Sequence, residues 1–128
     1  MSNSWQPYVD NNLVGSGSIS DAAIYGLDGG LWAQSKAFTH NDDLFDTIKG
    51  GFEKEDVIRS NGLRIGKDKY FTLSTSPEEL HFRCGSKGLF CAKTKQMIIV
   101  AFYPDTVQPG SASKALGAVT DYLKSVDF

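Results

Sequence analysis

The feature that most constrains the fold is a series of short runs, rich in β-branched and aromatic residues, in the second half of the chain. The connections between them are three to six residues long and contain Gly66, Ser76-Pro77 and Gly85. Parallel strands need crossovers of about a dozen residues or more, so these connections predict an antiparallel meander. The five predicted strands are Leu63–Ile65, Tyr70–Leu73, Leu80–Arg83, Leu89–Lys93 and Met97–Phe102.

Two more strands are predicted near the N-terminus, at Ala22–Gly26 and Leu31–Ser35. Between them lies Leu27-Asp28-Gly29-Gly30, and an Asp-Gly pair tolerates the positive φ of a tight turn. The pattern therefore predicts a hairpin, and the whole sheet should have six or seven strands.

Helices are predicted before, between and after these strands. The first covers Ser4–Val14, with Ser4 as its N-cap and Gly15 and Gly17 at its end. Its apolar residues recur at helical spacing: Trp5, Tyr8, Val9 and Leu13. The second begins at a cap, Asn41 or Thr39, and should stop at Gly50-Gly51, with a further helical turn near 55–59. Its apolar face is formed by Leu44, Phe45, Ile48 and Phe52.

The last segment, Pro109–Phe128, has the clearest helical pattern. Tyr122 lies at the edge of its apolar stripe, where we expect a half-buried ring with a reachable hydroxyl. The stripe consists of Ala112, Leu116, Val119, Leu123 and Val126.

These elements predict an α+β fold in a single domain over residues 1–128. A central antiparallel sheet should carry the N- and C-terminal helices on one face and the smaller helices on the other. If so, Trp5 and Tyr8 come close to Tyr122 and Phe128, and Trp32 can join them from the hairpin.

Composition excludes several classes of function. A net charge of −2 does not favour nucleic acid as a partner. Cys84 and Cys91 lack zinc or CxxC spacing and are expected to be reduced thiols. His40 and His81 form no catalytic or metal-binding pattern, so we expect no enzyme, no metal and no cofactor. Without a signal peptide or a membrane-length apolar run, a soluble intracellular protein is expected.

The aromatic residues at the chain ends suit a proline-rich ligand. A polyproline II segment presents flat ring faces and carbonyls without internal partners. Trp and Tyr rings stack on those faces, and their N–H and O–H groups donate to the carbonyls. Any one of these aromatics alone is better explained by packing in the helix–sheet seam, but four on the termini favour a groove.

The sequence resembles the profilin family nearly from end to end. The stretches that carry the likeness are "SWQPYVDNNLVGSG", "AAIYGLDGGLWAQS", "SNGLRI", "GLFCAKTKQMIIVAFYP", "TVQPG" and "DYL". The resemblance implies an antiparallel sheet between terminal helices and two smaller ones. It also implies binding of monomeric actin, exchange of its nucleotide, binding of proline-rich factors such as formins, and a place in the cytoplasm and cytoskeleton.

Carried over from the family, the polyproline-binding residues are Trp5, Tyr8, Trp32, Tyr122 and Phe128. Phe128 stands where many members have Tyr. It keeps the stacking face but lacks the hydroxyl, so one hydrogen bond of about 1 kcal/mol is missing. The implied actin-binding residues are Arg59, Lys69, Arg83, Lys87, Gln108, Gly110 and Lys114. Without the resemblance, these charges are better explained as a solvated surface.

Many members bind phosphoinositides, but this chain departs from their pattern. Ser74 stands where many fungal and amoebal members carry a basic residue, and Glu78-Glu79 lie where those members have an Arg-rich turn. We therefore expect weak phosphoinositide binding.

Two alternatives remain open. One is a small-molecule sensor domain of the PAS or GAF type, in which Leu31–Trp32, Phe71 and Phe90 line an internal cavity. The other is a structural module whose aromatics bind nothing.

Overall fold

The structure, a computed structural model, describes residues 5–35, 42–65 and 67–128. Its centre is an antiparallel sheet in the order β2-β1-β7-β6-β5-β4-β3. The strands are β1 (Asp21–Gly26), β2 (Leu31–Gln34), β3 (Leu63–Ile65), β4 (Asp68–Thr75), β5 (Glu79–Cys84), β6 (Lys87–Lys93) and β7 (Met97–Tyr103). Strands β3 to β7 are neighbours in sequence order, which confirms the predicted meander. The β1–β2 hairpin joins the sheet through β7.

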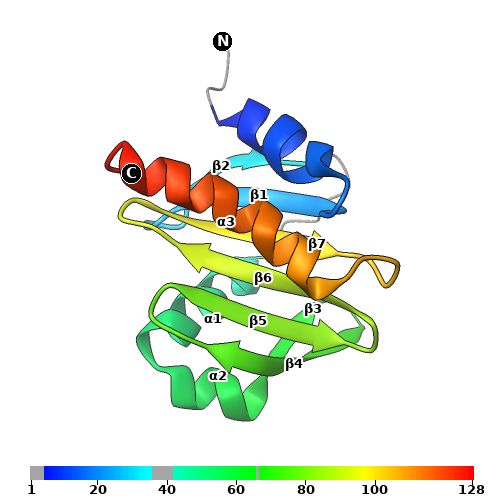
Figure 1. The fold of residues 1–128 in the computed structure, drawn as a ribbon. Coiled ribbons are helices and arrows are strands. Elements are labelled where there is room, and N and C mark those ends of the chain that lie inside the picture. The colour runs from blue at the N-terminus through cyan, green and yellow to red at the C-terminus, as the bar shows by residue number, and fades with distance from the viewer. Residues whose placement is uncertain (1–4, 36–41, 66) are drawn as a thin grey trace.

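The helices cover both faces of the sheet, as predicted (Figure 1). One face carries the N-terminal segment η1 (Tyr8–Leu13) and η2 (Val14–Ser16) together with α3 (Pro109–Ser125). The opposite face carries α1 (Asp42–Glu53) and α2 (Glu55–Asn61). The two ends of the chain therefore meet on the same side of the sheet.

Strand β7 explains how the two cores are built. Met97, Ile99 and Ala101 point into the core under the terminal helices, whereas Ile98 and Val100 point into the core under α1 and α2. Both faces of this central strand are covered, so its sequence is continuously apolar rather than alternating. The fully buried Met, Ile and Val side chains each contribute about 1.5–3 kcal/mol to the free energy of unfolding.

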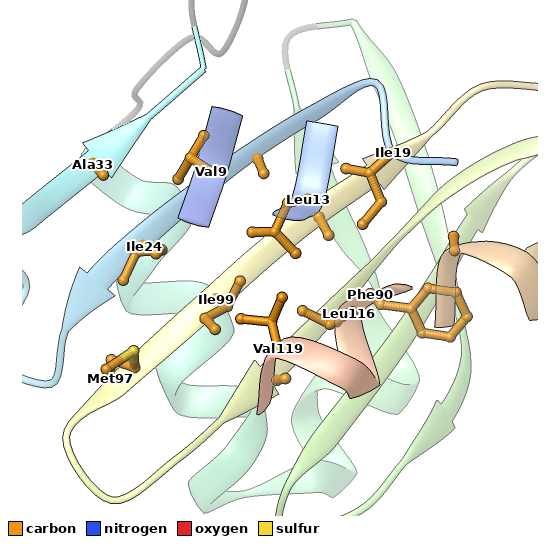
Figure 2. Close-up of a cluster of buried hydrophobic side chains, with 14 of the residues drawn as sticks. Val9, Leu13, Ile19, Ile24, Ala33, Phe90, Met97, Ile99, Leu116 and Val119 are labelled. Atoms are coloured by element: carbon orange, nitrogen blue, oxygen red, sulfur yellow. The ribbon is translucent and has the colours of Figure 1, made fainter. Parts of the chain in front are cut away.

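The core under the terminal helices is shown in Figure 2. Val9 and Leu13 from the N-terminal segment pack in one cluster with Leu116 and Val119 from α3 and with Ile99 of β7. All five side chains are buried. This contact holds the two ends of the chain together and so fixes the position of the side chains that the terminal helices carry on their outer surfaces.

The N-terminal helix differs from its prediction. Tyr8–Leu13 form a π-helix, followed by a 3-10 turn over Val14–Ser16. The wider π turn changes which residues share a face, and apolar spacing alone does not distinguish it from an α-helix. Gly17, with φ of 83°, ends the segment as predicted, whereas Gly15 lies within the 3-10 turn. The proposed cap Ser4 lies outside the described residues.

The prediction that Gly50-Gly51 stop the second helix was wrong, because α1 continues to Glu53. A Cβ at Gly51 would lie 3.0 Å from Leu80 Cδ1 and 3.2 Å from Ile58 Cβ. A side chain there would require Leu80 or Ile58 to shift by a few tenths of an ångström, so close packing favours glycine despite its low helix propensity. The candidate caps Thr39 and Asn41 lie outside the described residues.

Smaller differences concern element ends and the cysteines. The helical turn expected near 55–59 is α2, which extends to Asn61 and ends at Gly62 with φ of 65°. Helix α3 ends at Ser125, three residues before the predicted end. Cys84 and Cys91 are both free, as expected.

Candidate functional site

Five aromatic side chains from three distant parts of the chain form one cluster, which we call the aromatic groove: Trp5, Tyr8, Trp32, Tyr122 and Phe128. The Trp5 ring is central: its centroid lies 5.6 Å from Tyr8, 5.4 Å from Trp32 and 5.2 Å from Phe128. Tyr8 stacks in turn on Tyr122, with centroids 6.4 Å apart. The predicted meeting of the two chain ends is therefore observed.

The N-terminal segment is held in place by a buried side chain and by a hydrogen bond to the edge strand. Val9 is buried in the core and anchors the helix that carries Tyr8. At the edge of the sheet, Gln6 Nε2 donates to the carbonyl of Gln34 at 2.8 Å. This bond joins the start of the chain to β2, which also carries Trp32.

Trp32 is positioned by the hairpin turn. Asp28 Oδ1 accepts from the Gly30 N–H at 3.0 Å, and Gly29 adopts φ of 99°. The Trp32 ring lies directly over Gly26, where a Cβ would come within 2.7 Å of Trp32 Cζ2. A bare backbone at Gly26 is therefore needed for the stack between Trp32 and Trp5.

Phe128 reaches the groove because the chain turns back after α3. Asp127 has φ of 69°, and the Phe128 N–H donates to the Leu123 carbonyl at 2.9 Å. The Gln96 N–H, in the turn between β6 and β7, donates to the Phe128 carbonyl at 3.3 Å. These contacts hold the Phe128 ring edge-on against Trp5, at an angle of 89°.

The groove remains open to solvent. Tyr122 is 52% exposed, and the other four rings are partly buried. Partial burial raises the pKa of Tyr8, and the charge and hydrogen bonding of the neighbouring Tyr122 raise it further. The raised pKa keeps the Tyr8 phenol protonated at neutral pH. The site can offer ring faces together with phenol groups to an extended ligand.

The basic residues predicted for a second surface lie on several elements. Lys69, Arg83 and Lys87 belong to the adjacent strands β4, β5 and β6. Arg59 lies on α2, with Nε donating to Thr75 Oγ1 of β4 at 2.8 Å. The remaining predicted residues are at the start of α3: Gln108, Gly110 and Lys114.

Several of these cations already have partners within the chain. Lys87 Nζ lies 2.8 Å from Asp68 Oδ2, and this contact is the first cause of the raised pKa of Lys87. Arg83 Nε donates to the Gly85 carbonyl at 2.8 Å, and Lys69 Nζ donates to the Asn61 carbonyl. These groups are exposed or partly exposed, so each pair contributes little to stability.

Sequence reasoning missed an apolar component of this second surface. Phe71 is 64% exposed on β4 and pairs across the sheet with Arg83 of β5. Leu73 is 53% exposed at a bulge between Thr72 and Ser74. Phe71 and Leu73 are two residues apart and share the face of β4 opposite to the buried Tyr70, so the alternation is regular but its apolar pair lies on the exposed face. We call Phe71, Leu73, His81 and Arg83 the open strand face.

His81 is the most enclosed member of the open strand face. Its ring stacks on Phe90, with centroids 4.0 Å apart and planes 14° apart. Its Nε2 lies 2.7 Å from the Tyr103 hydroxyl. Burial lowers the pKa of His81, and the positive charge of Arg83 lowers it further. The packing around His81 therefore favours the neutral form of its imidazole.

The residues expected to line a sensor cavity are not brought together. Phe71 and Leu31 are exposed, and Phe90 is buried beneath the His81 ring. Trp32 belongs to the aromatic groove. The sensor interpretation of these residues was therefore wrong.

Comparison with known proteins assigns the chain to a family. The family model described as Profilin matches residues 3–128. The chain belongs to the profilin family. Curated profilins are similar over almost the whole length: Profilin-1B of Acanthamoeba castellanii is 38% identical over 125 residues, covering 98% of this chain and 99% of that protein. The profilin of Drosophila melanogaster is 38% identical over 120 residues, covering 94% and 95%.

Solved structures show the same profilin fold. Acanthamoeba castellanii profilin IB matches with a TM-score of 0.92 at 38% identity, covering 98% of this chain and 100% of that chain. Mouse profilin IIa, solved in complex with a double repeat from the FH1 domain of mDia1, matches with a TM-score of 0.78 at 20% identity over 98% and 99%. At that identity, the second likeness concerns the fold alone.

The described part of this profilin contains neither a cluster of metal-binding side chains nor a helix suited to span a membrane. Among residues 5–35, 42–65 and 67–128, no group of three or more His, Cys, Asp or Glu side chains could hold a metal ion. None of the helices in the same ranges has the length and apolar character needed to span a bilayer.

Proposed function

We propose that this profilin is a non-enzymatic adaptor that binds proline-rich segments, such as those of formins, in the aromatic groove and monomeric actin on a second surface. The observation that carries the proposal is the meeting of Trp5 with Phe128 from opposite ends of the chain, at 5.2 Å, in a groove that stays open. Aromatics that only filled the seam would be covered. The complex of mouse profilin IIa with an FH1 repeat supports the same ligand class.

The groove offers several ring faces to an extended proline-rich ligand. Neighbouring ring centroids lie 5.2 to 6.4 Å apart, and one turn of polyproline II, three residues at about 3.1 Å each, is long enough to span two neighbouring rings. The ligand is already extended before it binds, so little conformational entropy is lost. Stacking on the ring faces provides affinity, and the Tyr8 and Tyr122 hydroxyls can pair with ligand carbonyls.

Retention on a polyproline column tests the groove. Trp5→Ala removes the central ring and should abolish retention. Tyr122→Ala removes an exposed ring, so the fold should persist while affinity falls by about two- to twelvefold, the equivalent of 0.5–1.5 kcal/mol. Unchanged retention of both variants would refute the assignment. Thermal unfolding of Tyr122→Ala serves as the control for folding.

We propose that actin binds to the open strand face together with the basic residues around it. Arg59, Lys69, Arg83 and Lys87 provide cations that complement an acidic partner, and Phe71 with Leu73 provides exposed apolar area. Exposed apolar side chains at the centre of a charged surface are typical of protein interfaces. The proposal includes Gln108, Gly110 and Lys114 at the start of α3.

Charge reversal tests this surface. Arg83→Glu should weaken binding to monomeric actin strongly, because it places a carboxylate in the proposed basic surface. Lys54→Glu changes an exposed lysine between α1 and α2 and is the matched control. Equal actin affinities for the two variants would contradict the proposed surface while leaving the groove untouched.

We also propose that the bound profilin speeds nucleotide exchange on actin and works in the cytoplasm and at the cytoskeleton. Exchange requires no catalytic group, since a partner that favours the open nucleotide cleft shifts the population toward release. Release of a labelled ATP from actin, measured with and without the protein, tests this activity directly. An unchanged release rate at saturating protein would limit the function to binding and delivery.

A further inference from the structure

The last residues of the chain, 126–128, form a turn that brings the Phe128 ring to the aromatic groove; we call them the C-terminal turn. The Phe128 N–H donates to the Leu123 carbonyl at 2.9 Å, and the Asp127 N–H donates to the Lys124 carbonyl at 3.2 Å. These two hydrogen bonds are those of a Schellman motif, a common way to end a helix. The motif therefore sets the path of the backbone after α3 and, with it, the place of the Phe128 ring.

The left-handed position of this motif carries an unusual residue. Asp127 adopts φ of 69°, a conformation that glycine most often provides at the end of a helix because it has no Cβ. Among the described residues, Asp127 is the sole non-glycine residue with positive φ. Glycine would adopt this backbone at a lower cost, so we looked for what the aspartate side chain contributes.

The Asp127 carboxylate pairs with the turn between β6 and β7. Lys95 Nζ lies 2.9 Å from Asp127 Oδ1. The next residue of the same turn, Gln96, donates its N–H to the Phe128 carbonyl at 3.3 Å. The β6–β7 turn thus holds two consecutive residues of the C-terminal turn, one through a charge and one through the backbone.

These contacts matter because the end of a chain frays unless it is tied down. The side chains of the ion pair are 65% exposed for Lys95 and 81% exposed for Asp127, so the pair does not serve a buried core. Phe128 itself is only partly buried, and its contact with Trp5 at 5.2 Å depends on the place of the C-terminal turn. A ligand that needs the Phe128 ring binds only molecules in which this turn is closed, and its apparent affinity falls with that fraction.

We propose that Asp127 and the β6–β7 turn, through Lys95 and Gln96, are positioning residues that hold Phe128 where it contacts a proline-rich ligand. The proposal rests on the proposed polyproline function and adds to it residues outside the five rings. It has a consequence that the rings alone do not have. The rings and a polyproline peptide are uncharged, yet their affinity should depend on ionic strength, because salt screens the exposed ion pair.

Tryptophan fluorescence titrations with the end-blocked peptide (Pro)8 test the proposal. Asp127→Asn removes the charge but keeps a residue type that tolerates the left-handed conformation. It should weaken binding by about 1.5- to fivefold, the equivalent of about 0.2–1 kcal/mol for an exposed ion pair. Asp127→Ala also removes that tolerance, so it should weaken binding more than Asp127→Asn does. Lys95→Arg keeps the charge and should bind like the wild type.

Ionic strength provides an independent measurement. Raising NaCl from about 20 mM to about 500 mM shortens the Debye length from about 20 Å to about 4 Å. This change should weaken (Pro)8 binding by the wild type and should not weaken it for Asp127→Asn. Lys93→Gln is the matched control, because Lys93 ends β6 beside the same turn and is not the partner of Asp127. This variant should retain both the affinity and the salt dependence of the wild type.

A double-mutant cycle shows whether the effect passes through Phe128. Phe128→Ala removes the ring that the C-terminal turn positions, while the other four rings of the groove remain. In this background, Asp127→Asn should change the affinity for (Pro)8 by less than about 1.5-fold, because the positioned ring is already gone. An effect of Asp127 that does not act through Phe128 would instead weaken binding equally in both backgrounds. Thermal unfolding of each variant is the control for folding.

The outcomes distinguish the two proposals. If (Pro)8 binds the wild type but Asp127→Asn and Asp127→Ala bind it equally well, the positioning role is refuted and the polyproline function stands. The positioning role is also refuted if Asp127→Asn weakens binding to the same extent with and without Phe128, or if it retains the salt dependence of the wild type. If the wild type itself does not bind (Pro)8, the polyproline function is wrong and the positioning role falls with it.

Discussion

Gly26 should control polyproline binding although its own backbone is buried in β1. In Gly26→Ala, the new Cβ would lie 2.7 Å from Trp32 Cζ2 and 2.8 Å from Cε2 and Nε1. Carbon atoms in contact prefer separations of about 3.5–4.0 Å, so the indole must withdraw by roughly 1 Å. The same indole stacks on Trp5 with centroids 5.4 Å apart, and a withdrawal of this size disturbs that stack.

Two consequences of different size are expected from Gly26→Ala. Overpacking of this kind lowers the free energy of unfolding by about 1–3 kcal/mol. Loss of one aromatic stacking contact in the groove is worth about 0.5–1.5 kcal/mol, which corresponds to a two- to twelvefold weaker binding of (Pro)8. Fluorescence titration gives the affinity, and thermal unfolding of the same sample gives the stability.

Gly50→Ala is the matched control. A Cβ at Gly50 meets nothing within 4 Å, and the residue lies within α1 on the opposite face of the sheet. The same chemical change should therefore stabilise the protein by about 0.5–1 kcal/mol and leave the affinity for (Pro)8 unchanged. The reasoning fails if Gly26→Ala binds (Pro)8 as tightly as the wild type, because Trp32 would then not depend on the bare backbone beneath it.

Three further results are expected. Burial and the charge of Arg83 lower the pKa of His81 in the folded state, so the unfolded chain binds the proton more readily and the free energy of unfolding should fall as pH drops below about 6.5. Denaturant titrations at several pH values should show this pH dependence for the wild type and for the control His40→Gln, and should not show it for His81→Gln. Phe128→Tyr adds a phenol beside Trp5 and should tighten (Pro)8 binding by about fivefold in a fluorescence titration, equivalent to one hydrogen bond of about 1 kcal/mol. An unchanged affinity would count against hydrogen bonding to the ligand at this position. Co-sedimentation with phosphoinositide vesicles at physiological salt should be weak and should increase in Glu78→Arg; strong binding by the wild type would contradict the charge argument.

The sheet could be predicted because each of its determinants is local in the sequence. Short apolar runs joined by three to six residues can pair only as antiparallel neighbours, and the Asp28-Gly29 turn specifies a hairpin. The meeting of Trp5 and Phe128 followed from the expectation that the two terminal helices, each with an apolar stripe, pack on one face of the sheet, as they do. The resemblance to a known family then assigned polyproline binding to the same five rings.

Features that depend on tertiary packing could not be predicted. The sequence around Gly50-Gly51 indicates a helix end, whereas α1 continues to Glu53 and brings Gly51 against Leu80 and Ile58. Phe71 and Leu73 lie on the exposed face of β4, whereas an alternating apolar pattern by itself would place them toward a core. The π-helix at Tyr8–Leu13 could not be predicted either, because the spacing of its apolar residues does not distinguish its hydrogen-bonding pattern from that of an α-helix.

Helix α3 joins the two proposed surfaces. Its start contributes Gly110 to the proposed actin surface, and its end contributes Tyr122 to the aromatic groove. Twelve residues at about 1.5 Å each separate them by about 18 Å along the helix axis. At that distance, an actin monomer and a proline-rich segment need not compete for the same side chains. A single molecule that holds both partners raises the effective concentration of actin beside the proline-rich factor, so saturating (Pro)8 should leave the affinity for actin essentially unchanged. Mutual exclusion of the two ligands in a competition titration would show that the surfaces overlap and would contradict the adaptor function.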